Sequence, residues 1–152
     1  MLFRSPEIER LQISRVKRLF SATRRNGLEF LLEIIPSKVG SVDDTTTASL
    51  IDRFYSAGIY PDWWKLEPFK TEAAWANACA SIERNDPHTR GVVVLGLDAP
   101  EEALSESFAL ATKQPLVKGF AVGRTIFGDA ARAWMQGLLS DETAVEQMRM
   151  RF

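Results

Sequence analysis

The sequence contains one cysteine and one histidine in 152 residues, and this scarcity excludes several kinds of chemistry. A single cysteine, Cys79, cannot form an internal disulfide and fits a reducing compartment. We interpret it as a small buried residue of an alanine-rich helix rather than a nucleophile. The histidine, His88, lies in a turn predicted over residues 85–88, and a Ser-His-Asp or Cys-His arrangement would depend on it. Zinc sites usually need several His or Cys ligands, so metal-dependent chemistry is disfavoured, and we expect no metal and no cofactor.

The sequence also lacks a long apolar run and an excess of either charge. No run approaches the about 20 apolar residues that cross a bilayer, and residues 1–5 do not resemble a signal peptide. The 19 basic and 20 acidic side chains are interspersed and give a net charge of -1. This balance provides neither a nucleic-acid-binding stripe nor a patch for anionic membranes. We therefore expect a cytoplasmic protein that binds neither nucleic acid nor membrane.

What the sequence does contain is an alternation of apolar runs with segments of helical periodicity. Runs typical of strands occupy residues 28–35, 61–68, 91–95 and 116–122, and the first is expected to be buried on both faces. Helical spacing covers residues 6–24, a segment between 43 and 58, residues 71–84, a segment from 100 to about 111, one after 125 and one from 141 onward. One helix followed by four strand-helix units is typical of an α/β fold with a parallel sheet, and residues 1–152 contain no linker.

The spacing of the strand ends narrows this fold class. Glu33, Lys65, Leu95 and Val122 mark corresponding strand ends and are separated by 32, 30 and 27 residues. A (β/α)8 TIM barrel spreads about 250 residues over eight units, or about 31 per unit. The spacing therefore predicts a partial barrel of four units, and an open four-stranded sheet is the alternative. A half-barrel has two unpaired edges and an uncovered inner face, so we expect missing sequence or another copy of the chain, a homo-oligomer, to complete it.

Lys65 is the candidate catalytic nucleophile at one of these strand ends. If Trp63, Trp64 and Leu66 partly bury its amine, the lost hydration would lower its pKa and make the neutral amine available. A neutral amine attacks ketones to form an iminium, which acts as an electron sink for cleavage of a carbon-carbon bond. Proton transfer in that reaction requires an acid or base, and Glu33 is the candidate.

The last two strand ends carry groups that suit an anion. Functional groups of parallel α/β folds gather at the carboxyl ends of the strands. Gly96, near Asp98, and Gly123 allow backbone amides to approach a phosphate, and Arg124 can bind it in a bidentate manner. In barrels the loops after strands seven and eight often hold phosphate, and these are those loops if the partial barrel corresponds to strands five to eight, with Lys65 at the end of strand six. Asp62 precedes its strand and points to the other end of the sheet, so we assign it no catalytic role.

Each of these residues also has a structural interpretation. Lys65 could lay its stem on aromatic rings and keep its ammonium in water. Glu33 could form a purely structural ion pair with Lys65 or Lys38, and Arg124 could cap or brace a helix. Lys118 is a rival nucleophile, but it lies mid-strand, four residues before the predicted strand end.

Four segments together resemble a known family. They are Leu32-Glu33-Ile34-Ile35-Pro36, Pro61-Asp62-Trp63-Trp64-Lys65-Leu66, residues 91–100 (GVVVLGLDAP) and residues 117–127 (VKGFAVGRTIF). The chain is similar, from about Glu7 to Phe152, to the aldolase-like domain of uncharacterised function that is fused to the 5-dehydro-2-deoxygluconokinase of bacterial myo-inositol catabolism. That domain resembles in turn the class I tagatose-bisphosphate aldolases. In those enzymes a Leu-Glu strand end, an Asp-x-x-Lys-x-Glu strand end and a final Gly-Arg supply the acid/base, Schiff-base and phosphate-binding groups.

The resemblance implies roles for individual residues and a reaction. Glu33, Lys65, Gly123 and Arg124 match the family's functional positions, and Glu67 matches the glutamate after the lysine. The implied reaction is the retro-aldol cleavage of a phosphorylated 5-dehydro-2-deoxygluconate, a phosphorylated keto-sugar acid, into dihydroxyacetone phosphate and malonate semialdehyde. The implied partner is a sugar kinase domain in the same or an associated chain. The alternative is a non-catalytic domain that binds the phosphosugar or holds the kinase in an assembly. A metal-dependent aldolase or isomerase is disfavoured by the lone histidine.

Overall fold

The computed structural model describes residues 5–96 and 101–151, and the chain alternates helices and strands throughout them. The elements are α1 (Pro6–Arg25), β1 (Leu31–Ile34), the 3-10 turn η1 (Pro36–Lys38), α2 (Thr46–Ser56), β2 (Trp63–Leu66), α3 (Glu72–Asn85), β3 (Gly91–Leu95), α4 (Glu101–Ala111), β4 (Val117–Ala121), α5 (Arg124–Met135) and α6 (Asp141–Met150). The predicted strands and helices are confirmed, although β1 and β2 are shorter than the apolar runs that contain them. The predicted start of the helix at Pro100 lies outside the described residues.

The strands form one parallel sheet in the sequential order β1-β2-β3-β4. Each crossover contains a helix, as parallel neighbours require. One row of the register runs across the sheet through Glu33, Lys65, Val93 and Gly119. A bulge between Val92 and Val93 leaves Lys118 as the extra residue of β4. The coarse prediction of an α/β fold with a parallel sheet is therefore confirmed.

Local hydrogen bonds explain where several helices begin. The side chains of Ser5, Thr71 and Ser140 accept hydrogen bonds from the backbone amides three residues further on, at 3.1 to 3.2 Å. A hydroxyl at this position satisfies an amide that the helix itself leaves without a partner. Gly58, with φ of 75°, follows the end of α2 in the left-handed conformation that glycine adopts without strain.

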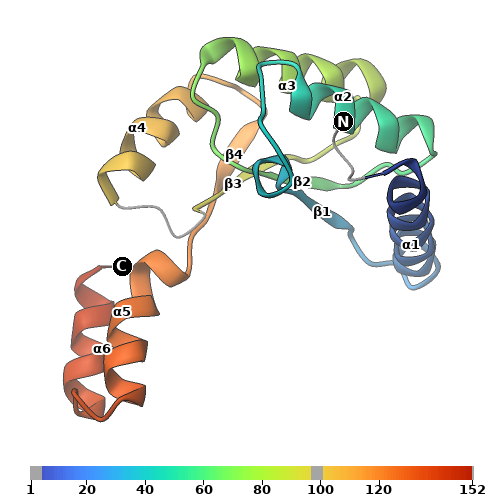
Figure 1. Cartoon of the computed structure of the whole chain (residues 1–152). Helices are drawn as coiled ribbons and strands as arrows, with labels where there is room; N and C mark the ends of the chain where they lie inside the picture. Colours follow the sequence, from blue (N-terminus) through green and yellow to red (C-terminus); the bar gives the residue numbers. More distant parts are fainter. Residues whose placement is uncertain (1–4, 97–100, 152) are drawn as a thin grey trace.

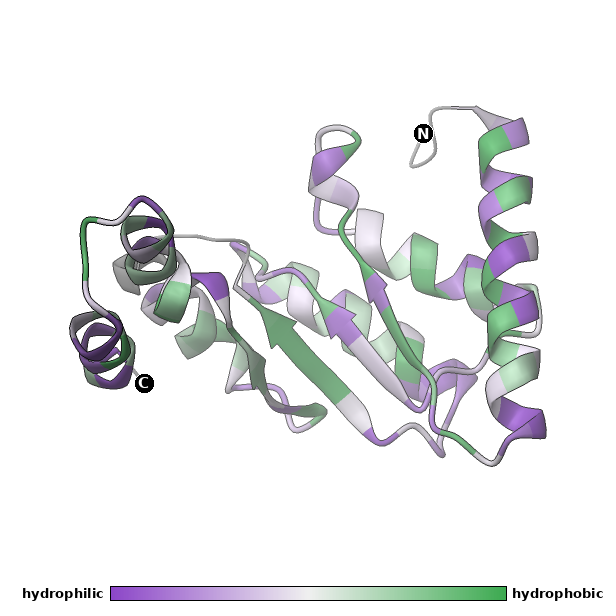
Figure 2. Ribbon diagram, turned by 90° about the horizontal axis from the view of Figure 1, so that it is seen from below, coloured by the Kyte–Doolittle hydropathy of each residue, from purple (hydrophilic) through white to green (hydrophobic). Residues whose placement is uncertain are grey.

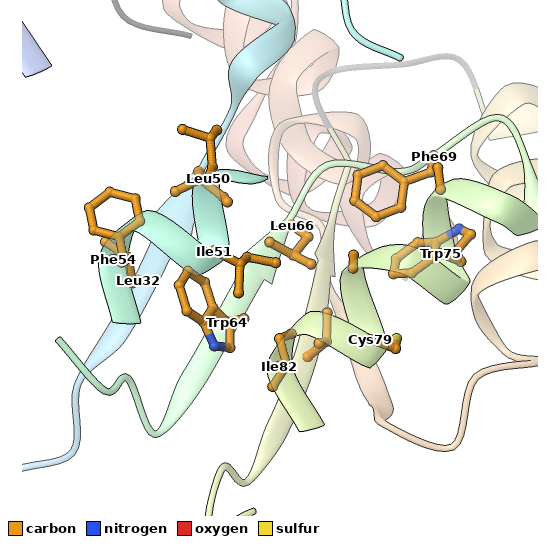
Figure 3. Packing of buried hydrophobic residues seen from close by; sticks show 14 of the residues in the cluster. Leu32, Leu50, Ile51, Phe54, Trp64, Leu66, Phe69, Trp75, Cys79 and Ile82 are labelled. Atoms are coloured by element: carbon orange, nitrogen blue, oxygen red, sulfur yellow. The ribbon is translucent and has the colours of Figure 1, made fainter. Parts of the chain in front are cut away.

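The core lies between the sheet and helices α2 and α3, on one face of the sheet (Figure 3). Trp64 and Leu66 of β2 are fully buried there, and Ile51 of α2 and Trp75 of α3 pack with them. The Nε1 of Trp64 donates a 2.9 Å hydrogen bond to the hydroxyl of Tyr55, so its polar atom is satisfied inside the core. The predicted inward stripe of the helix ending near Gly58 is confirmed, because Leu50, Ile51, Phe54 and Tyr55 are all buried.

On the opposite face of the sheet, residues 5–96 and 101–151 form no comparable helical layer (Figure 2). β1 alternates between exposed and buried residues, with Leu31 and Glu33 on the exposed side. The prediction that the run 28–35 is buried on both faces is therefore wrong. A nearly unbroken apolar run, interrupted by Glu29 and Glu33, suggested two covered faces, but the helices cover only the side that Leu32 and Ile34 face.

The outer elements lie beside the two edges of the sheet (Figure 1). α1 stands next to β1, and its Phe20 contacts Phe30 edge-to-face with the ring centroids 5.6 Å apart. Beyond β4, α5 and α6 pack against each other and extend away from the sheet. Phe120 of β4 stacks on Phe108 of α4 at 5.1 Å. No helix among the described residues is both long enough and apolar enough to span a membrane.

Candidate functional site

A hollow of about 300 Å³ lies at the carboxyl ends of the strands. All five residues predicted for the site line it. The lining residues are Glu33, Ile35, Lys38, Lys65, Leu95, Gly96, Ala121, Gly123, Arg124, Thr125 and Phe127. They come from all four strands, from the segments after β1, β3 and β4, and from the start of α5, because the carboxyl ends of parallel strands meet at one edge of the sheet. Asp98, expected near Gly96, lies outside the described residues.

Lys65 and Glu33, which both line this hollow, form an ion pair. Their strands are neighbours and the two residues are register partners, so their side chains emerge side by side on the open face. The Lys65 ammonium lies 2.9 Å from Oε1 of Glu33. The two side chains are 26% and 41% exposed, so both remain accessible to a ligand. Of the two lysines considered as partners of Glu33, the one that pairs with it is Lys65 and not Lys38.

The surroundings of Lys65 differ in one respect from the expectation. Trp64 and Leu66 do not bury its amine, because successive side chains of a strand point to opposite faces. Those two side chains are fully buried on the helix-covered face, whereas Lys65 and Trp63 are partly exposed on the other face. The apolar neighbours in the sequence are therefore not the neighbours of the ammonium in space.

The loops after β3 and β4 form the other wall of the hollow. Gly96 is buried directly after β3, and Gly123 is the N-cap residue of α5. A Cβ at Gly123 would approach the ring of Phe127 to 3.1 Å, so glycine allows this close packing of the loop on α5. Arg124 and Thr125 follow in the first turn of α5, where backbone amides favour a bound anion.

Lys38 also lines the hollow, although no sequence pattern predicts a site role for it or the contacts that hold its turn. Lys38 ends η1, directly after the strand that carries Glu33. Glu67, which is only 4% exposed, accepts a 3.1 Å hydrogen bond from the backbone amide of Ser37 and a second one from the Ser37 hydroxyl. A buried carboxylate needs such donors to offset its lost hydration. The family resemblance points to Glu67, but no local sequence pattern indicates that Ser37 is its partner.

Two other charged residues are placed away from the hollow. The Lys118 ammonium donates a 2.7 Å hydrogen bond to the backbone oxygen of Pro115, before the start of β4. Asp62 lies before β2, where it accepts a 2.7 Å hydrogen bond from the Phe30 amide and pairs with Arg24 at 2.9 Å. Burial would raise the pKa of Asp62, but the hydrogen bonds from Phe30 and Arg24 outweigh it and lower the pKa.

The lone cysteine and histidine also lie apart from the hollow. Cys79 is buried in α3, and burial raises its pKa to about 11, so the thiol is protonated at neutral pH. This confirms its interpretation as a small buried residue. His88 lies in the turn after α3, and its amide donates to Asp86. Over residues 5–96 and 101–151, no three His, Cys, Asp or Glu side chains cluster closely enough to hold a metal ion.

Fold and site together define a parallel α/β protein with a lysine-carboxylate pair and two glycine-containing loops around one hollow. Residues 4–152 match the model of a family described as an uncharacterized protein conserved in bacteria (DUF2090), and the chain belongs to this family. The comparison with curated proteins gave no match.

Proposed function

We propose that the chain is a class I, Schiff-base aldolase domain that acts on a phosphorylated keto-sugar acid. The observation that carries this proposal is the contact of 2.9 Å between the Lys65 ammonium and Glu33, in a hollow that Gly96, Gly123 and Arg124 also line. A nucleophilic amine, a proton carrier and an anion-binding wall are the groups that this reaction needs. The proposed substrate is a phosphorylated 5-dehydro-2-deoxygluconate.

In the proposed reaction, Glu33 takes a proton from Lys65, and the neutral amine adds to the ketone carbon of the substrate. Loss of water from this adduct gives an iminium. The second carbon from the iminium carbon carries a hydroxyl. Removal of the proton of this hydroxyl breaks the bond between that carbon and the carbon next to the iminium, and the bonding electrons move into the iminium to form an enamine. Malonate semialdehyde leaves. Protonation of the enamine and addition of water then release dihydroxyacetone phosphate and regenerate the amine.

The loops after β3 and β4 would bind the phosphate of this substrate. The glycines allow backbone amides to approach the phosphate oxygens, and the first turn of α5 favours negative charge. Arg124 would add two parallel hydrogen bonds. A phosphate fixed at this wall would keep the substrate ketone within reach of Lys65 across the hollow.

We further propose that the sheet is half of an eight-stranded TIM barrel and supplies strands five to eight. Four parallel strands in sequential order, with helices on one face only, support this proposal. A second copy or further sequence would supply the other strands. In the proposed setting, a sugar kinase of cytoplasmic inositol catabolism, in the same or an associated chain, produces the phosphorylated substrate.

Borohydride trapping tests the aldolase proposal. The protein is incubated with dihydroxyacetone phosphate and sodium borohydride, and its intact mass is measured. We expect one covalent adduct on the wild type, no adduct on Lys65→Ala, and a wild-type adduct on Lys118→Ala, which removes the same charge from a lysine outside the hollow. Trapping by Lys65→Ala at the wild-type level would contradict the proposal.

A second candidate function is a non-catalytic domain that binds a phosphosugar or assembles with a kinase. Large apolar side chains on α5 and the segment after it favour it, because Trp134 is 49% exposed and Met135 and Leu138 are each 71% exposed. Under this alternative, Lys65→Ala leaves cleavage of the phosphorylated keto-sugar acid unchanged, and deletion of the domain alters kinase assembly or substrate affinity.

A further inference from the structure

The turn η1 places a further lysine, Lys38, at the hollow, and a buried hydrogen-bonded contact holds this turn in place. Both oxygens of Glu67 accept hydrogen bonds from Ser37, one from its amide at 3.1 Å and one from its hydroxyl. Glu67 is the first residue after β2, so this contact joins the turn after β1 to the end of the neighbouring strand. The buried Pro36 begins the turn and fixes its own φ angle. The backbone that carries Lys38 is therefore held in place.

Lys38 differs from the other charged residues of the hollow in its pairing. Glu33 is paired with Lys65 at 2.9 Å, and Lys38 forms no ion pair with any residue of the described ranges. Its side chain lines the hollow and is exposed to solvent. An accessible ammonium without a carboxylate partner keeps its charge available for an anion from outside.

The position of Lys38 suggests which anion it binds. Lys38 follows β1 and Arg124 follows β4, the two outer strands of the sheet, and Lys65 lies on a strand between them. Three strand spacings of about 4.8 Å separate the outer strands, so the two cations approach the hollow from opposite sides. If the phosphate of a ligand binds at the loops after β3 and β4, Lys38 faces a different part of the same ligand.

We propose that Lys38 binds a second anionic group of the substrate, a carboxylate, at the end opposite the phosphate. This inference rests on the proposed function and assigns a residue to the carboxylate of the proposed substrate. The preferred ligand is a phosphorylated keto acid with its ketone between a carboxylate and a phosphate. Lys38 contacts the carboxylate, and Glu67 is a positioning residue that acts through Ser37.

Two ligands separate the role of Lys38 from that of Lys65. Phosphorylated 5-dehydro-2-deoxygluconate carries both anions, and dihydroxyacetone phosphate carries the ketone and the phosphate without the carboxylate. Binding of each is measured by titration calorimetry on the full chain, together with borohydride trapping. For Lys38→Gln we expect at least about tenfold weaker binding of the keto acid, unchanged binding and trapping of dihydroxyacetone phosphate, and recovery of keto-acid binding in Lys38→Arg.

Lys70→Gln is the matched control, because Lys70 is an exposed lysine after β2 that does not line the hollow. It should bind both ligands as the wild type does. Equal weakening of both ligands by Lys38→Gln, or of neither, would overturn the inference. If the wild type does not trap dihydroxyacetone phosphate, the aldolase proposal fails. The calorimetric comparison of the keto acid between wild type and Lys38→Gln still decides whether Lys38 binds a carboxylate.

Discussion

The two faces of the sheet are built from the same strands, yet they contain different chemistry. On the helix-covered face Trp64, Leu66 and Val94 are at most 1% exposed. On the open face the side chains of Glu33 and Lys65 are 41% and 26% exposed. The period-two alternation of a strand divides adjacent residues of one chain between these environments.

The comparison shows that stability and the proposed chemistry depend on separate residues. Burial of large apolar side chains contributes most of the favourable free energy of folding, and it is concentrated under α2 and α3. An exposed ion pair contributes little to stability, so the pair on the open face is free to serve a ligand. Four predictions follow from this division, from the largest expected change in stability to the smallest.

Trp64→Ala should produce the largest loss, because it removes a fully buried indole and leaves a cavity beside Phe54 and Tyr55. We expect the free energy of unfolding to fall by about 3–5 kcal/mol, measured by urea denaturation. Trp134→Ala is the matched control, because that indole is 49% exposed on α5, and it should cost less than about 1 kcal/mol. Equal losses would mean that the helix-covered face is not the main source of stability.

The sequence alone was sufficient to predict the helices and strands, and to predict that the site residues meet at the carboxyl ends of the strands. Apolar periods of 2 and 3.6 predicted the strands and helices, and parallel topology brought Glu33, Lys65 and Arg124 to one hollow. Lys65 is partly buried as predicted, but Trp64 and Leu66 were wrongly expected to bury it, because sequence neighbours were treated as spatial neighbours. Applying the alternation of a strand to Trp64 and Lys65 would have avoided this error.

Other features depended on register and turn geometry, which residue types alone do not determine. The bulge at Val92 and Val93 sets the place of Lys118, and no local pattern indicates it. The contact of Glu67 with Ser37 joins residues 30 positions apart. It requires the turn after Pro36, so the position of Lys38 could not be predicted without the fold.

Gly91→Ala should give the second largest loss in stability. Gly91 has φ of 140°, and a Cβ there would lie 2.6 Å from the backbone oxygen of Leu116 and from Cγ of Lys118. We expect a cost of about 1–3 kcal/mol from backbone strain and displacement of β4. Gly119→Ala is the matched control, because a Cβ there meets nothing within 4 Å, and urea denaturation should show little change. A similar cost at both glycines would contradict this account.

Asp62→Asn tests the amino end of the sheet and its dependence on pH. The folded state lowers the pKa of Asp62 below its ordinary value of 3.8, because the hydrogen bonds from Phe30 and Arg24 outweigh burial. The ionised form therefore stabilises the fold above pH 3.8, and this stabilisation is lost as pH falls through the lowered pKa. We expect a loss of about 1 kcal/mol at pH 7 and a smaller difference from wild type in acid. Unfolding midpoints measured from pH 7 down to pH 2 provide the check, and a difference that grows in acid would reverse the assigned sign.

The ion pair of the open face should give the smallest change. Lys65→Met and Glu33→Gln should each alter the free energy of unfolding by less than about 1 kcal/mol at pH 7, because the pair is accessible to water and costs side-chain entropy to hold. A double-mutant cycle measured by urea denaturation isolates the coupling between them. Coupling below about 1 kcal/mol, combined with loss of borohydride trapping in Lys65→Met, would assign the pair to the ligand rather than to the fold. Coupling of about 3 kcal/mol would instead make it a structural bridge, and the division between the two faces would then fail at the residues that define the site.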